Sequence, residues 1–328
     1  MKEKFYGYYK PTEEEFKTLW EDALFVVDTN VLLDMFRFSE EAVEVLLNTI
    51  EKLQDRLWLP YRVAFEYHRN LNDIIAEQVK NYEDTIKTLS CFRSDLTGKN
   101  HPFLDDEFNE EVTNFCEKFD KELDKKKQEI EELLFNNPRK ERIANIFNGK
   151  VGEEYEIDEE FRKDADERYK KKIPPGYKDK NKQGDEQYGD YLIWKDIMEK
   201  GKIEKKSIIF ITRDVKEDWF LEKRGKTLGP RPELIQEFEK ETQKKFYAYQ
   251  TTHFLKFSNT YLNSGIKDTI ITEVERITKE QKDRSITEAV RTEPVYNTEN
   301  TTMTIHSMGS TSSESSLGDS VTEQTASI

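Results

Sequence analysis

The chain has 328 residues and carries 52 basic against 67 acidic side chains, so its net charge of −15 argues against a non-specific nucleic-acid binder. It contains no run of 18 apolar residues and no basic-then-apolar leader, so we expect a soluble, cytoplasmic protein without membrane contact. Its two cysteines, Cys91 and Cys116, lie in polar helical sequence and predict neither a disulfide framework nor a zinc site.

Strand-type and helix-type patterns alternate in the first part of the chain. Helices are expected where a capping residue precedes apolar residues at helical spacing, and strands where a short apolar run stops at an acid or a proline. The predicted elements are a helix from Thr12 to about Glu21, a strand over 24–27, a helix from Ser39 to about Leu53, a strand over 57–59, and a helix after Pro60 that reaches about Leu89.

The middle of the chain has a different composition. Residues 91–170 are charge-dense with sparse apolar positions, which favours a helical insertion over a globular core. Core-type sequence returns at Tyr188. The later predicted elements are a helix over 190–198, a strand over 207–212, a helix over 233–244, a strand over 246–249, and helices from Thr251 and from about Ile266.

These patterns predict one α/β domain in two parts. Strands that alternate with helices imply a parallel or mostly parallel sheet. The end of the chain is rich in Ser and Thr and is expected to be a disordered tail. We therefore expect the first part of the domain at 1–90, the insertion at 91–170, the second part at 171–282 and the tail at 283–328.

Four acids stand at comparable places in this arrangement. Asp28 and Asp214 each follow an apolar strand, Asp190 opens a helix, and Glu66 lies one turn into the helix after Pro60. Taken singly, Asp190 is typical of a helix cap, Asp214 of a turn and Glu66 of a solvated helix. Only Asp28 has no local reason to be acidic. Carboxylates that converge repel each other unless a cation neutralises them, so the set predicts a Mg²⁺ or Mn²⁺ site for phosphodiester hydrolysis.

Further residues are expected near this site. Asp218 lies four residues after Asp214 and is a rival or companion metal ligand. Asn30 is expected to contact Asp28 or a substrate phosphate, and Thr29 to form a turn that orients the Asp28 carboxylate. Basic residues that could approach phosphate are Lys178, Arg213, Lys216 and Arg231. The lysine-rich stretch 170–182 fits either a nucleic-acid contact or a solvated loop.

The motifs together resemble a PIN-domain nuclease, and more narrowly a bacterial PIN-like group. The resemblance rests on four stretches in a fixed order: Phe25-Val-Val-Asp-Thr-Asn30, Pro60 with Glu66 downstream, Tyr188-Gly-Asp-Tyr-Leu-Ile-Trp194, and Ile211-Thr-Arg-Asp-Val-Lys-Glu-Asp-Trp219. It implies a three-layer α/β/α fold and a Mg²⁺- or Mn²⁺-dependent nuclease acting on RNA or single-stranded DNA, with an endoribonuclease favoured. It also implies that Asp28, Glu66, Asp190 and Asp214 are the catalytic and metal-binding acids.

The resemblance leaves several points open. The long separation of Glu66 from Asp190 suggests that the insertion acts as an arch or lid over the substrate. Members of the group look like bacterial defence or stress nucleases, which would fit a regulatory protein partner. The alternative is a non-catalytic PIN-like scaffold that binds RNA or a protein. RNA against DNA, endo- against exonucleolytic cutting, the number of metals and the oligomeric state stay undecided.

Overall fold

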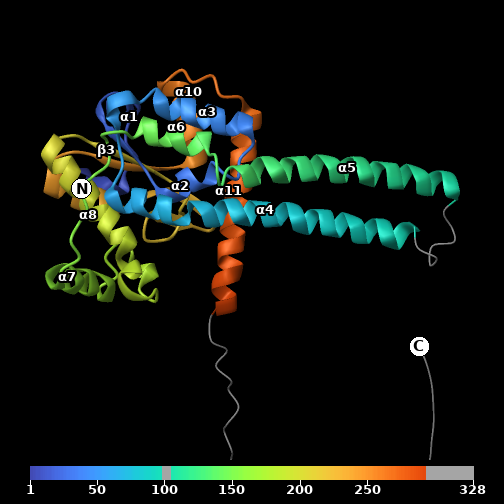
Figure 1. Ribbon diagram of the computed structural model, residues 1–328. Coiled ribbons are helices and arrows are strands. Elements are labelled where there is room, and N and C mark those ends of the chain that lie inside the picture. The colour runs from blue at the N-terminus through green and yellow to red at the C-terminus, as the bar shows by residue number, and fades with distance from the viewer. Residues whose placement is uncertain (98–104, 293–328) are drawn as a thin grey trace, which may run out of the picture. The chain divides into compact units, whose positions relative to one another are not determined.

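A four-stranded parallel sheet forms the centre of the protein. The computed structural model describes residues 1–97 and 105–292 (Figure 1). The strands are β1 (Leu24–Val27), β2 (Leu57–Trp58), β3 (Ile208–Thr212) and β6 (Phe246–Gln250), in the order β2-β1-β3-β6. All four residues of β1 and all five of β3 are buried, because parallel strands are covered on both faces. The predicted α/β class with a mostly parallel sheet is confirmed.

Helices surround this sheet. In chain order they are α1 (Glu13–Asp22), α2 (Thr29–Asp34), α3 (Glu40–Glu51), α4 (Tyr61–Thr97), α5 (Asp106–Glu132), α6 (Pro138–Ile146), α7 (Glu159–Lys170), α8 (Gly189–Glu204), α9 (Pro232–Thr242), α10 (Thr251–Tyr261) and α11 (Asp268–Thr292). Short 3₁₀ turns cover Lys2–Lys4, Tyr6–Tyr8, Gln54–Arg56, Tyr177–Asp179 and Gly184–Tyr188.

Aromatic side chains hold helices to both faces of the sheet. On one face, Trp20 of α1 packs against Phe25 of β1 and stacks on Phe254 of α10. On the other face, Trp194 of α8 packs edge-on against Phe246 of β6. Because side chains alternate along a strand, β1 and β6 serve both layers. The result is the expected order of helices, sheet and helices.

Helix α2 and a β-hairpin were not predicted. Helix α2 begins directly after Asp28, whose side chain caps it by accepting a hydrogen bond from the Thr29 N–H at 2.7 Å. The antiparallel hairpin of β4 (Phe220–Lys223) and β5 (Lys226–Pro230) turns at Arg224 and Gly225, both with positive φ. Such a two-residue turn matches the twist of a hairpin, and glycine adopts it without strain.

The segment expected as an insertion has two different parts. The first is a hairpin arm formed by the distal part of α4 and by α5, which pack side by side (Figure 1). Ile75 is the last buried side chain of α4 within the described residues. The second part belongs to the core, because Ile143 of α6 and Phe161 of α7 are buried in the same apolar cluster as the sheet. A projecting insertion is therefore limited to the arm, and its role as an arch stays a proposal.

The end of the fold is helical for longer than expected. Helix α11 continues to Thr292, so the first residues of the segment expected as a tail, 283–292, are helical. The rest of that segment, residues 293–328, lies outside the described residues.

The arm should be removable without loss of the fold. Replacing residues 87–126 with a short Gly-Asn linker joins the two arm helices near the core. Of the described residues, it removes the buried Cys116 but no member of the apolar cluster around the sheet. We expect a cooperative thermal transition with a midpoint within a few degrees of the parent protein, as measured by circular dichroism. A deletion of residues 95–165 is the matched comparison and should abolish the transition, because it removes α6 and part of α7. Loss of cooperative unfolding in the shorter deletion would show that the arm is part of the core.

Candidate active site

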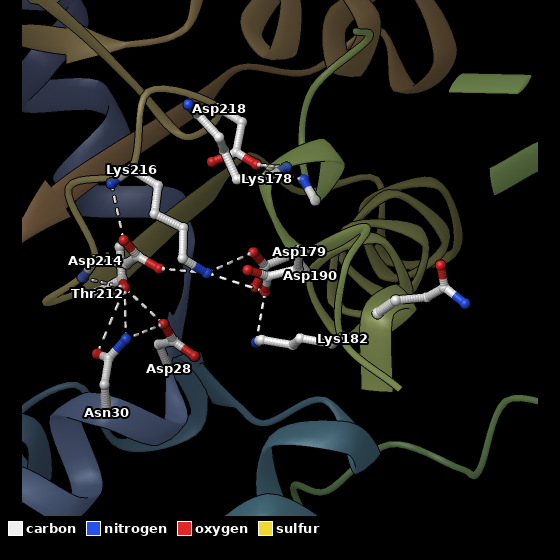
Figure 2. A network of polar contacts seen from close by, with 12 residues as sticks. Asp28, Asn30, Lys178, Asp179, Lys182, Asp190, Thr212, Asp214, Lys216 and Asp218 are labelled. Carbon is white, nitrogen blue, oxygen red and sulfur yellow. Dashed lines mark hydrogen bonds and ion pairs between the residues drawn. The ribbon is translucent and has the colours of Figure 1, made fainter. Parts of the chain in front are cut away.

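Asp28 lies where the strand order of the sheet reverses. The chain leaves β1 for β2 on one side and later returns to β3 on the other, so the carboxyl ends of β1 and β3 form the switch point at which open α/β sheets bind ligands. Val27 pairs with Ile211, which brings Asp28 beside Thr212. Asp28 Oδ2 accepts hydrogen bonds from the Thr212 hydroxyl at 2.5 Å and from Asn30 Nδ2 at 2.6 Å (Figure 2).

The residues that follow Asp28 fix the direction of its carboxylate. Asn30 is itself held, because its Oδ1 accepts a hydrogen bond from the Arg213 N–H at 2.7 Å. The Thr29 N–H caps the other Asp28 oxygen, and the Thr29 hydroxyl donates to Glu66 Oε2 at 3.3 Å. Asp28 is therefore oriented by backbone and neutral side-chain donors from two strand ends.

Glu66 reaches the same place from α4. Its Oε1 accepts a hydrogen bond from Arg62 Nε at 2.6 Å, one helical turn away. A Cβ atom at Gly189, the first residue of α8, would lie 3.3 Å from Glu66 Oε1. Glycine at this position therefore allows the start of α8 and the Glu66 carboxylate to approach each other closely.

A lysine lies between the remaining acids. Lys216 Nζ is 3.1 Å from Asp214 Oδ2, 3.3 Å from Asp190 Oδ2 and 3.0 Å from Asp179 Oδ2. Figure 2 shows its side chain running from the loop after β3 into the space between Asp214 on one side and Asp179 and Asp190 on the other. Lys182 adds a second ammonium, 2.7 Å from Asp179 Oδ2.

These groups line one cavity of about 250 Å³. All four predicted acids are part of its wall, and they come from the end of β1, from α4, from the start of α8 and from the loop after β3. The other lining residues used below are Thr29, Asn30, Asp179, Lys182, Ile193, Arg213 and Lys216. The sequence order of the acids thus becomes a spatial cluster.

Burial and mutual repulsion change the acidity of the cluster. Burial raises the pKa of Asp28 to about 6; the Thr212 hydrogen bond opposes the rise, and the charges of Asp214 and Glu66 add to it. Burial also raises the pKa of Asp190, against the effect of Lys216. These two carboxyls therefore bind protons more tightly than exposed acids do.

The lysine is charged under all ordinary conditions. Burial alone would lower the pKa of Lys216, but Asp190, Asp214 and Asp179 raise it far above its usual range. Burial likewise opposes ionisation of Asp179, yet Lys216 and Lys182 hold its pKa below the ordinary value. The Lys216 ammonium is therefore a fixed positive charge among carboxylates.

Three predicted residues lie elsewhere. Asp218 is fully buried outside the cavity, and its Oδ2 accepts hydrogen bonds from the backbone N–H groups of Gly176 and Lys178 at 3.0 and 3.2 Å. The Lys178 ammonium pairs with Glu217, and Arg231 pairs with Glu233. The structure thus does not bring Asp218, Lys178 or Arg231 to the cavity. Arg213 does line it, while pairing with Asp34 at 2.9 Å.

Sequence reasoning missed Asp179, Thr212 and the central position of Lys216. Asp179 ends a Pro-Pro-Gly-Tyr-Lys-Asp stretch in which nothing distinguishes it from the neighbouring charges. Thr212 is the last residue of β3, so its place opposite Asp28 follows only from the β1–β3 register. Lys216 stands two residues after Asp214, a spacing that signals proximity once Asp214 is taken as a site residue.

The donor chemistry of the cavity fits a hard divalent cation. Carboxylate oxygens are the ligands that Mg²⁺ and Mn²⁺ prefer, and Asp28, Glu66, Asp190 and Asp214 supply them. In the present arrangement, no three His, Cys, Asp or Glu side chains of the described residues are placed to hold an ion together. Lys216 supplies the positive charge instead, so a cation would take its place beside Asp190 and Asp214.

Comparison with known proteins agrees with the fold. A family model described as a PIN like domain matches residues 24–234, well over half of the chain. The protein therefore belongs to the PIN-like domain family, whose fold is generally of the nuclease type. PIN-like domains commonly bind nucleic acids, and PIN domains usually use a divalent metal.

No curated protein and no solved structure matches the chain. Within residues 1–97 and 105–292, no helix is both long and apolar enough to cross a membrane.

Neutralising Asp28 should change how stability depends on pH. Between the ordinary pKa of 3.8 and about 6, the folded protein holds a proton on Asp28 that the unfolded chain has lost, so this residue makes the fold less stable as pH rises through that window. Relative to the parent protein, Asp28→Asn should therefore gain on the order of 2 kcal/mol between pH 4 and pH 7.5. Urea unfolding at both pH values measures the difference, and Asp73→Asn, an exposed acid on α4, is the control. If the stability difference between Asp28→Asn and the parent protein were the same at both pH values, the raised pKa of Asp28 would be contradicted.

Removing Lys216 should leave the acids without their counter-charge. We expect Lys216→Ala to lose about 2 kcal/mol or more at pH 7.5, because breaking a partly buried ion cluster leaves unpaired charge. Lys182→Ala is the matched control and should lose less than about 1 kcal/mol, because its ammonium is half exposed. Mn²⁺ should raise the melting temperature of Lys216→Ala more than that of the parent protein. Equal responses to Mn²⁺ would mean that the lysine and the metal do not compete.

Proposed function

We propose that this protein is a metal-dependent nuclease that hydrolyses phosphodiester bonds in RNA or single-stranded DNA. The observation that carries the proposal is the convergence of Asp28, Glu66, Asp190 and Asp214 on one cavity, at the switch point of a PIN-like domain. Acids from four separate elements meet there although their repulsion makes the arrangement costly. Such a cost is expected at a functional site rather than at a purely structural one.

The carboxylates of Asp28, Glu66, Asp190 and Asp214, which all line the cavity, would hold Mg²⁺ or Mn²⁺. When bound, the ion would polarise the phosphate and make a water molecule nucleophilic near neutral pH. Asn30 and Thr212 would keep the Asp28 carboxylate directed into the cavity, both with and without a bound metal ion. Their hydrogen bonds of 2.6 and 2.5 Å to Asp28 Oδ2 support this positioning role.

Two basic side chains of the wall are suited to the substrate phosphate. Lys182 is half exposed and Arg213 is less exposed, and both line the cavity. With 67 acids in the chain, such local positive charge is what would draw a polyanion to this place. A cavity of about 250 Å³ admits a phosphate with its flanking sugar but not a double helix. This limit favours a single strand.

One observation favours the alternative of a non-catalytic PIN-like scaffold. Lys216 already pairs with Asp190 and Asp214, and also with Asp179, as a permanent cation would in a protein that needs no metal. The two functions differ in their response to Mn²⁺. A scaffold would show no rise in melting temperature with Mn²⁺, whereas a metal-binding site would show one that increases with the Mn²⁺ concentration.

Cleavage assays test the proposed function directly. Purified protein is incubated with labelled single- and double-stranded RNA and DNA in Mn²⁺, in Mg²⁺ or in EDTA. We expect cutting of single strands in Mn²⁺ or Mg²⁺ and none in EDTA. Asp28→Asn, Asp190→Asn and Asp214→Asn should each lower the rate by at least about 100-fold, because each removes a charge that acts on the transition state.

Glu217→Gln is the matched control for these variants. Glu217 lies three residues from Asp214 but pairs with Lys178 outside the cavity. It should cut at the parent rate. Retention of full activity in both Asp28→Asn and Asp190→Asn, with the fold intact, would sink the metal-site assignment.

A further inference from the structure

A second cavity, of about 210 Å³, lies directly behind the wall of the first. Arg62 lines this second cavity, and its Nε donates to Glu66, which lines the acid cavity. Along α8, Leu192 faces the second cavity and the next residue, Ile193, faces the first. The two cavities therefore share the wall formed where α4 meets α8.

Flat aromatic surface borders the second cavity. The rings of Tyr61 and Phe65 on α4 are stacked, with centroids 6.5 Å apart and planes 15° from parallel. The Phe65 side chain is 44% exposed, although burial of a phenyl ring would normally be favourable. The guanidinium groups of Arg62 and Arg69 each lie 5.7 Å from the Phe65 ring centre. Exposed rings flanked by arginines are the type of surface on which unpaired bases stack.

The cavity also contains an acid without a partner. Asp196 on α8 is only 9% exposed and lines the cavity, yet no hydrogen bond or ion pair joins its carboxyl group to another described residue. Burial raises its pKa to about 7, and Glu199 adds to the rise. By contrast, Asp185 in the same wall is paired with Arg162 at 3.0 Å. The unpaired Asp196 carboxyl group on the cavity wall is therefore free to accept hydrogen bonds from a ligand that brings N–H donors.

We propose that the second cavity binds an unpaired guanine base of the strand whose backbone enters the acid cavity. This inference rests on the proposed nuclease function and adds a base preference to it. The Watson–Crick edge of guanine carries two neighbouring N–H donors, which match the two acceptor oxygens of the Asp196 carboxylate. Adenine, cytosine and uracil each place an acceptor beside their donor, so only guanine satisfies both oxygens of the ionised group.

The size and charge of the cavity agree with this ligand. At about 210 Å³ it is smaller than the roughly 300–1,000 Å³ of pockets for drug-sized ligands, and suits one heterocycle. Acidic Asp196 and Glu154 in its wall disfavour a phosphate group. The base would therefore enter this cavity, while the phosphate stays on the side of Lys182 and Arg213.

Base preference can be measured without cleavage. Fluorescein-labelled uridine octamers with G, A, C or U at one central position are titrated with Asp28→Asn protein in Mg²⁺, which keeps the strand intact, and anisotropy reports binding. We expect the G octamer to bind at least about 10-fold more tightly than the other three, as a bidentate base contact would give. In the same background, Asp196→Asn should reduce this preference to about 2-fold or less, because an amide offers only one acceptor.

Glu199→Gln is the matched control, because it removes the same charge from α8 one turn away, outside the cavity, and should leave the preference intact. Phe65→Ala should weaken binding of all four octamers. Equal binding of the four, or a preference that Asp196→Asn leaves unchanged, would overturn the inference. Metal-dependent cutting without any base preference would overturn it while the proposed function stands. A guanine preference in a protein that cuts nothing would uphold the cavity assignment and reject the nuclease.

Discussion

Repulsion among carboxylates at the carboxyl edge of the sheet is the constraint around which the site is built. Charges this close, in surroundings of low polarity, would disperse or stay protonated unless other groups offset them. The protein offsets them in two ways. Neutral donors from Thr212, Asn30 and the backbone of Thr29 hold Asp28, whereas the Lys216 ammonium holds Asp179, Asp190 and Asp214. One half of the cluster is thus set by hydrogen-bond geometry and the other half by charge.

The two halves have different consequences for binding. Hydrogen bonds from neutral donors hold the ionised Asp28 side chain, so this carboxylate is a fixed point for a ligand. The lysine side can be rearranged, because the flexible stem of Lys216 can withdraw its ammonium group when another cation arrives. The stacking surface on α4 is joined to the fixed side through the Arg62–Glu66 pair.

The sheet and most of its helices follow from local patterns, whereas the four acids were predicted from their joint occurrence. A buried strand appears in the sequence as a run of apolar residues that ends at a polar one, and such runs stop at Asp28 and just before Asp214. Asp218 was expected beside Asp214 because it lies four residues further along the chain, yet its carboxylate holds the loop at Gly176. Only tertiary packing distinguishes the two roles. No sequence pattern marks Asp179 or Thr212. Thr212 reaches the site through the β1–β3 register, and Asp179 reaches it because its loop folds back onto the site. Helices α6 and α7 belong to the core although many of their residues are charged. A few buried positions suffice to anchor a short helix, and so few positions give no clear pattern in the sequence.

The strand order also affects how the protein is made. β1 is short, apolar and central, and its pairing with β3 must wait until most of the chain has been synthesised. At about 5–20 residues per second, that delay is on the order of 10–40 s. During it, the β3-facing edge of β1 has no partner on the nascent chain, and unpaired apolar edges invite association with other chains. The same delay keeps Asp214 and Lys216 from joining Asp28, so a chain interrupted during translation carries an incomplete acid cluster. Assembly of the site therefore cannot begin before the chain has been synthesised past Lys216.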